Sequence, residues 1–215
     1  MSLKPIKITF ELDGTGVSFD PTEPILLDAL LAWALAPFHC KGEPPTRDEP
    51  PMDIPLPLGR WHAHGAWGWT ASAIFPEGQL GEALSFWRKR FRVNRAELTR
   101  GTVNTQNAAY RDYNMPLPLL LCTRMVAYAL GDRKRVAHIL RKQVRYLGKK
   151  RAYGRGRVNN ITVEWYENDF SMTREGRAMR WLPQPGASRI VRPRPPYWNI
   201  VDAVPCCEIG DAWKC

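Results

Sequence analysis

The sequence predicts an α+β fold with the element order βαββαβ, and three observations support it. Ile6, Ile8 and Phe10 alternate with polar residues, as in a half-buried strand. Two stretches with helical spacing of apolar residues follow, at 25–35 and 132–147. Strand-like stretches precede and follow the second one, and we expect them at 60–75, 119–130 and 158–167. This order is that of a ferredoxin-like (RRM-like) domain, whose sheet is a common platform for RNA.

The first strand and helix have clear limits in the sequence. Gly14-Thr15-Gly16 is predicted to end the strand. Pro24 is predicted to open the apolar helix ILLDALLAWAL, because proline is tolerated in a first helical turn. The helix is expected to continue to about Leu35, with Pro37 as its end.

A long central region is harder to assign. Residues 37–60 are rich in proline and acidic residues, which predicts a long loop. The stretch FWRKRFRVNR is a second basic patch with Arg88, Arg90 and Arg92, and we interpret it as a strand with one charged face. Residues 101–118 are polar and are expected to form an ordered loop that presents Asn104, Gln106, Asn107, Tyr110 and Arg111.

The chain is predicted to divide near residue 170. Residues 1–170 would form the ferredoxin-like domain, with an insertion at about 37–117. Residues 171–215 would form an irregular, basic, proline-rich C-terminal extension that includes Arg189, Arg192 and Arg194.

Positive charge is concentrated in one segment, residues 132–157. It holds eleven of the 31 Lys and Arg residues and one of the 21 acidic residues, so the rest of the chain is balanced. A localised positive field of this kind indicates a polyanionic partner.

The basic segment has a predicted helix followed by a loop. Asp132 is the expected N-cap and Gly148 the expected stop, with one apolar face between them. The glycine loop, residues 148–157, then combines basic residues with Tyr153, which could stack on a base, and with Gly154-Arg155-Gly156. A basic helix alone is more often a solvated face, but helix, loop and strand together favour nucleic-acid binding.

Several classes of protein are not indicated. No run of 18 apolar residues is present, and MSLKPIKITFELD has the pattern of a strand rather than of a signal peptide. Five cysteines without paired spacing favour reduced thiols and a cytoplasmic location. His62 and His64, His39-Cys40 and Cys206-Cys207 lack the recurrent spacing of a zinc site. We therefore expect no metal and no cofactor.

Four stretches resemble the RAMP superfamily of CRISPR-associated proteins. ITFELDG opens the chain, ILLDALLAWAL follows the first strand, and LRKQVRYLGKKRAYGRGRV precedes the last strand with the glycine-rich loop typical of that superfamily. The polar GTVNTQNAAYRDYNMPLP before an apolar strand resembles the small subunit of type IV systems. The resemblance covers most of residues 4–167.

The resemblance implies a non-catalytic role in antiviral defence. Such a subunit binds the five-prime handle of the guide RNA (crRNA), caps one end of the ribonucleoprotein complex, and contacts the backbone and large subunits near the entry of target DNA. Direct contact with target DNA is left open. The glycine loop of the resemblance and the basic and polar residues named above together make up the predicted RNA-binding set. It consists of Arg88, Arg90, Arg92, Asn104, Gln106, Asn107, Tyr110, Arg111, Arg141, Lys142, Arg145, Lys149, Lys150, Arg151, Tyr153, Gly154, Arg155, Gly156 and Arg157.

Two alternatives remain open at this point. His39 follows the first helix, near the place where RAMP endoribonucleases often have a catalytic histidine, so a metal-independent crRNA-processing endoribonuclease is the second hypothesis. A stand-alone RNA-binding module is the third. No partner for His39 is evident in the sequence, and a compact RNA module needs neither the insertion nor the extension, so the binding subunit is preferred.

Overall fold

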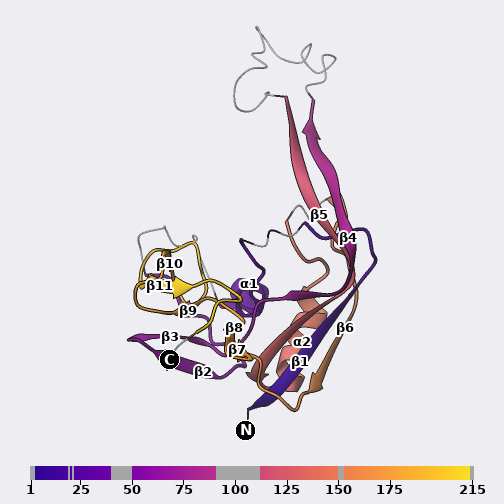
Figure 1. Cartoon of the computed structure of the whole chain (residues 1–215). Coiled ribbons are helices and arrows are strands. Elements are labelled where there is room, and N and C mark those ends of the chain that lie inside the picture. Colours follow the sequence, from indigo (N-terminus) through magenta and orange to yellow (C-terminus); the bar gives the residue numbers. More distant parts are fainter. Residues whose placement is uncertain are drawn as a thin grey trace.

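The described part of the chain is α+β, with a main antiparallel sheet and two helices (Figure 1). The computed structural model describes residues 3–18, 20, 22–39, 50–90, 112–149 and 153–213. The elements in chain order are β1 (Lys4–Leu12), α1 (Leu27–His39), β2 (Arg60–Ala63), β3 (Ala66–Trp69), β4 (Phe75–Lys89), β5 (Tyr113–Gly131), α2 (Arg133–Gln143), β6 (Val158–Trp165), β7 (Thr173–Arg174), β8 (Arg177–Ala178), β9 (Leu182–Pro183), β10 (Arg189–Val191) and β11 (Val204–Cys207).

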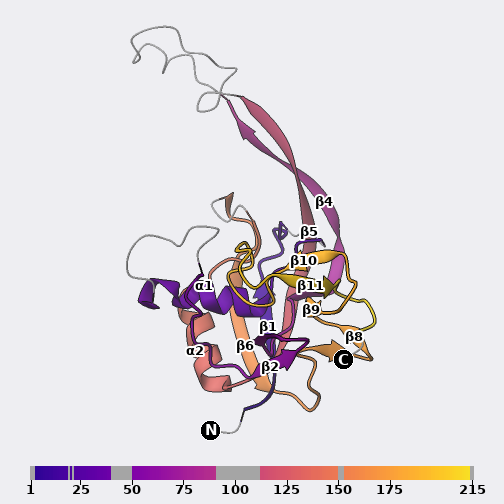
Figure 2. The ribbon, with the colours of Figure 1, turned by 90° about the vertical axis from the view of Figure 1, so that its left-hand side faces the viewer.

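The main sheet has the strand order β4-β5-β1-β6, and all neighbours are antiparallel. On β1, Ile6, Ile8 and Phe10 are fully buried, as their alternation predicts. They join one core cluster with residues of both helices, so α1 and α2 cover the same face of the sheet, as Figure 2 shows. No helix in the described residues is long and apolar enough to cross a membrane.

Helix α1 differs from the prediction at both ends. It begins at Leu27 rather than just after Pro24, because Leu26 pairs with Ala73 in a β-bridge instead. It continues to His39 and contains Pro37. The prediction that Pro37 ends the helix was wrong, because the helix runs two residues past it. Proline lacks the N–H that would bond to the carbonyl four residues back, so the last turn has one hydrogen bond fewer.

Helix α2 begins as predicted and ends early. The Asp132 carboxylate accepts hydrogen bonds from the backbone N–H groups of Lys134 and Arg135, at 3.0 and 3.1 Å, which is N-capping. The helix stops at Gln143 rather than at Gly148, and Val144 is already extended. Val144 and Leu147 are still buried in the same core, so the apolar spacing that suggested more helix reflects burial in an extended segment.

Strands β4 and β5 form a long two-stranded ribbon that projects from the sheet (Figures 1 and 2). β4 confirms the prediction of a strand for the basic stretch up to Lys89. β5 has 19 residues and begins at Tyr113, so residues 113–118, which were predicted as loop, are strand. Pairing with β4 along the whole ribbon satisfies their backbone and overrides the local signal of two prolines.

The region predicted as one strand at 60–75 is instead a β2–β3 hairpin, followed by the start of β4. Its turn is at His64-Gly65. The described part of the C-terminal extension, to residue 213, contains five short strands, and β10, β11 and β9 form a small sheet. Figure 1 shows this sheet beside α1 and the hairpin.

Three arginines fasten the extension to the rest of the chain, and we call Arg180, Arg192 and Arg194 the buried arginine cluster. Arg180 is fully buried and pairs with Asp28 of α1 at 3.0 Å. It also donates to the carbonyl oxygen of Ala71 at 2.9 Å. Burial opposes the charge on Arg180, but Asp28 outweighs it and the pKa of Arg180 is raised.

Arg192 and Arg194 both pair with Asp53, at 2.8 and 3.0 Å. Two of the three arginines that make up the predicted basic run of the extension are therefore interior residues. Cys206 and Cys207 are buried free thiols, and burial raises the pKa of Cys206 to about 12, so it is no reactive thiolate.

Candidate nucleic-acid interface

The glycine loop is closed at its base by backbone hydrogen bonds of the chain itself. The Leu147 N–H donates to the Gly156 carbonyl at 2.8 Å, and the Val158 N–H donates to the Arg145 carbonyl at 2.9 Å. Tyr146 and Arg157 form a bridge between these two bonds. The loop therefore leaves and re-enters the fold at one fixed place, between α2 and β6.

The same loop is docked onto the turn that follows β1. The Gly156 N–H donates to the Gly16 carbonyl at 2.9 Å, and the Lys149 N–H donates to the Ser18 carbonyl at 3.2 Å. The Arg155 guanidinium donates to the Thr15 carbonyl at 2.6 Å. Two segments about 140 residues apart in sequence thus form one unit.

The two glycines of Gly-Arg-Gly have different reasons to be glycine. Both have a positive φ, +74° at Gly154 and +69° at Gly156. A Cβ at Gly156 would collide with the carbonyl oxygen of Leu147, so the chain itself occupies that space. A Cβ at Gly154 would meet nothing within 4 Å. The expected close approach of a ligand to the backbone therefore applies to Gly154, whereas Gly156 serves the internal packing of the loop.

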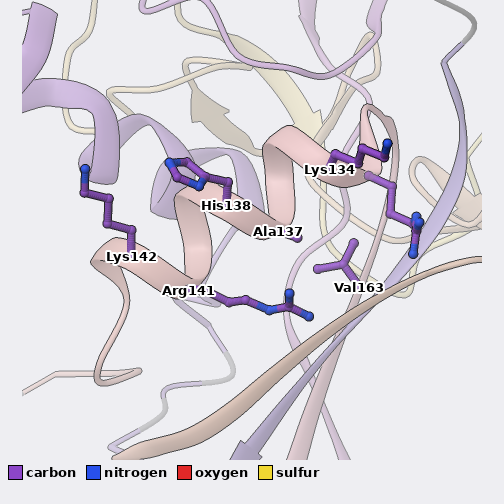
Figure 3. A pocket seen from close by; sticks show the side chains of 7 residues that line it. Lys134, Ala137, His138, Arg141, Lys142 and Val163 are labelled. Atoms are coloured by element: carbon purple, nitrogen blue, oxygen red, sulfur yellow. The ribbon is translucent and has the colours of Figure 1, made fainter.

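Helix α2 presents a basic face beside an open hollow of about 520 Å³. The hollow is lined by Arg133, Lys134, Ala137, His138, Arg141, Lys142 and Val163. Figure 3 shows Arg141 reaching from α2 towards β6, while His138 and Lys142 project on the other side of the helix. Arg141 Nε donates to the Ile161 carbonyl at 2.9 Å, which steadies the guanidinium beside the edge strand.

The described cations of residues 132–157 almost all lack a described acidic partner. The structure describes nine of its eleven Lys and Arg residues. Among those nine, Lys149 alone forms an ion pair with a described acidic residue, Glu23, at 2.7 Å, and both side chains are largely exposed. An exposed set of unmatched positive charges attracts phosphates and loses affinity as salt rises.

The sequence of this chain is similar to one family of CRISPR-associated proteins. The sequence model of the family described as CRISPR type IV associated protein Csf3 matches residues 4–97 and 84–208, which together span nearly the whole chain. The chain belongs to the Csf3 family. No curated protein matches it. The predicted resemblance to type IV CRISPR-associated proteins is thereby confirmed.

Within this Csf3-family fold, the predicted RNA-binding residues fall into three groups. Around the glycine loop lie Arg141, Lys142, Arg145, Lys149, Tyr153, Gly154, Arg155, Gly156 and Arg157. Arg88 and Arg90 lie on or just beyond β4, on the ribbon, where Arg88 Nε donates to Asn114 Oδ1 at 2.8 Å. Outside the described residues are Arg92, Asn104, Gln106, Asn107, Tyr110, Arg111, Lys150 and Arg151.

His39, the candidate catalytic residue of the alternative hypothesis, is the exposed last residue of α1. It forms no hydrogen bond or ion pair with any described residue, so nothing in that part of the chain orients it as a general base. The described residues also hold no group of three His, Cys, Asp or Glu side chains placed to bind a metal ion.

Sequence reasoning missed the residues that hold the glycine loop in place. Gly16 and Ser18 accept its backbone N–H groups, and Trp87 of β4 donates through its indole N–H to the hydroxyl of Tyr153. Gly14-Thr15-Gly16 was treated only as the end of a strand. A second glycine-containing turn beside the first strand was the available signal, but its partner could not be identified from spacing.

Proposed function

We propose that this Csf3-family protein is a non-catalytic subunit of a type IV CRISPR ribonucleoprotein that binds the five-prime handle of the crRNA. Family membership supports a place in such a complex with other CRISPR subunits. The handle, the capping of one end of the complex, and contacts to the backbone and large subunits follow from the resemblance to the small subunit. A cytoplasmic location stays a prediction.

The proposal includes a ferredoxin-like core made of β1, α1, β4, β5, α2 and β6. Support comes from their chain order, βαββαβ, and from the antiparallel sheet β4-β5-β1-β6 with both helices on one face. In this reading the β2–β3 hairpin is an insertion between α1 and β4, and the glycine loop connects α2 to β6.

One observation carries the proposal: the described ends of the glycine loop are hydrogen-bonded to the turn after β1, while the described cations around it, apart from Lys149, have no described acidic partner. Intrachain bonds to Ser18 and Gly16 hold the loop backbone at Lys149 and at Gly156. The described cations of residues 132–157, apart from Lys149, pair with no described acid. A fixed backbone provides shape and unmatched charge provides attraction, which is the combination that an RNA backbone requires.

Salt dependence of RNA binding tests the proposal. The purified protein is titrated with its repeat-derived handle RNA and with a scrambled RNA of equal length at several salt concentrations. We expect tighter binding of the handle RNA, and affinity that falls steeply with salt because phosphate contacts release counterions. Affinity for handle RNA that stays flat between low and high salt would contradict an electrostatic grip.

A further inference from the structure

Three aromatic residues from separate segments meet where the ribbon passes the glycine loop. Trp87 lies near the far end of β4, Tyr113 begins β5, and Tyr153 belongs to the loop. The Trp87 and Tyr113 rings are 4.5 Å apart between centroids and tilted by 56°. The Trp87 indole N–H donates to the Tyr153 hydroxyl. Desolvation and the nearby Tyr153 raise the pKa of Tyr113, which is consistent with three close rings.

The packing of the fold does not account for this aromatic cluster. None of the three residues belongs to a hydrophobic core cluster of the described chain. Tyr153 is 56% exposed. Its hydroxyl accepts a hydrogen bond from Trp87, and three residues further on the loop backbone is bonded to Gly16 through the Gly156 N–H. A ring that is already fixed loses little conformational entropy when a flat ligand stacks on it.

The surroundings of Tyr153 favour a nucleic-acid base as that ligand. Lys149, Arg155 and Arg157 flank Tyr153 in the glycine loop. Aromatic rings interleaved with cations are the usual composition of sites for single-stranded nucleic acid, where rings stack on bases and cations follow the phosphates. A duplex would not serve, because its bases are already stacked on one another.

We propose that Tyr153 stacks on one unpaired base of single-stranded RNA at the junction of ribbon and glycine loop. Trp87 is the positioning residue that orients Tyr153, and Tyr113 supports Trp87 from β5. This inference rests on the proposed crRNA-binding function and adds to it a base, rather than a phosphate, as the recognised group at this point.

The test is a thermodynamic cycle between Tyr153 and each base of the RNA. The probes are the repeat-derived handle RNA and a set of the same RNA in which one position at a time is abasic. Tyr153→Leu keeps an apolar side chain but removes the ring, and we expect it to weaken binding of the intact RNA at least fivefold, which is about 1 kcal/mol. On one abasic RNA, or two adjacent ones, the same substitution should have no further effect.

Two further variants separate stacking from folding. Trp87→Leu leaves the Tyr153 ring in place but unanchored, so we expect a smaller loss that also disappears on the same abasic RNA. Phe86→Leu is the matched control, because Phe86 neighbours Trp87 on β4 and its side chain points to the opposite face of the ribbon. It should leave every RNA affinity within about twofold.

The outcomes distinguish this inference from the function beneath it. If the wild-type protein binds no handle RNA, the proposed function fails. If the wild-type protein binds handle RNA with the expected salt dependence, but Tyr153→Leu behaves like Phe86→Leu on all RNAs, the stacking inference is refuted and the proposed function stands. An equal loss on every abasic RNA would also refute stacking, since Tyr153 would then act only through the structure of the loop.

Discussion

Two sets of arginines in this chain have the same chemistry and opposite surroundings. In residues 132–157 the described cations lie on an exposed helix face and loop, and only Lys149 has an acidic partner among described residues. In the C-terminal extension, Arg180, Arg192 and Arg194 are buried and face Asp28, Asp53 and Asp202. Both sets contribute to the net charge of +10, but only the first can act on a ligand.

The difference shows that a count of positive charges does not define a binding surface. The fully buried Arg180 makes five hydrogen bonds, to Asp28, Tyr197 and three backbone carbonyls. These bonds link α1, the β2–β3 hairpin and the extension, so the charge of Arg180 is neutralised inside the protein. Positive charge without an acidic partner predicts a binding surface better than the number of positive charges does, and by that measure residues 132–157 are the binding surface.

Breaking the buried pair should have the largest effect. Asp28→Asn leaves Arg180 buried with its main countercharge removed, so we expect the free energy of unfolding to fall by about 3–5 kcal/mol. Urea unfolding measures it. The control is Arg189→Gln, because Arg189 forms a partly exposed pair with Glu208, worth at most about 1 kcal/mol. Equal effects from the two variants would contradict the distinction between buried and surface pairs.

The glycine loop gives the next largest effect. Gly156→Ala forces a methyl group against the Leu147 carbonyl at a positive φ, so we expect a loss of stability above about 2 kcal/mol. Gly154→Ala has the φ strain without the collision and should lose about 1 kcal/mol. Thermal unfolding of the two variants checks the order. If the RNA affinity of Gly154→Ala also falls while Lys149 and Arg155 are intact, shape as well as charge contributes to binding.

Neutralising the basic face should change binding and leave stability alone. Lys134 and Lys142 line the hollow on α2 and pair with no described acid. We expect Lys134→Ala with Lys142→Ala to weaken handle RNA binding about tenfold and to reduce the salt slope by about 1.4, at roughly 0.7 for each single-strand phosphate contact. Unfolding free energy should stay within about 0.5 kcal/mol. An unchanged slope would place the RNA elsewhere, and Arg189→Gln again serves as the paired-cation control.

Replacing His39 should have no effect on RNA binding or on RNA cleavage. His39→Ala should leave both handle binding and handle integrity unchanged, because His39 is exposed and has no described partner to activate it. Repeat RNA incubated with wild-type protein and resolved on a denaturing gel should remain intact. Specific cleavage that disappears in His39→Ala would favour the endoribonuclease hypothesis instead.

The parts of the fold that depend on near neighbours were predictable from sequence. The alternation of Ile6, Ile8 and Phe10 gave β1, and Asp132 before a basic apolar-striped stretch gave the N-cap of α2. The end of α2 was not predictable, because Val144 and Leu147 are buried whether the chain is helical or extended. Spacing records which residues are buried and leaves the backbone conformation ambiguous over one turn.

Distant pairings account for the remaining failures. The buried partner of Arg180 is 152 residues away, and no local pattern distinguishes this arginine from a surface one. The docking of the glycine loop on the turn after β1 spans about 140 residues and the contact of Trp87 with Tyr153 spans 66, so neither is visible in a local pattern. The basic segment could be located because its signal, a charge excess, is contained within it.

Strand β5 has a mechanical consequence. Its 19 residues extend for about 60 Å at 3.3 Å per residue, with one end paired to β1 in the core and the other in the ribbon. The ribbon is therefore a lever whose pivot is the sheet and whose far end also contacts the glycine loop, through Trp87 and Tyr153. With an arm of about 30 Å from the nine residues nearest Tyr113, a rotation of 5° at the pivot displaces the far end by about 3 Å. A partner that pulls on the ribbon would thus load the hydrogen bonds between β1 and β5, and a change of sheet twist would be magnified at the ribbon's end.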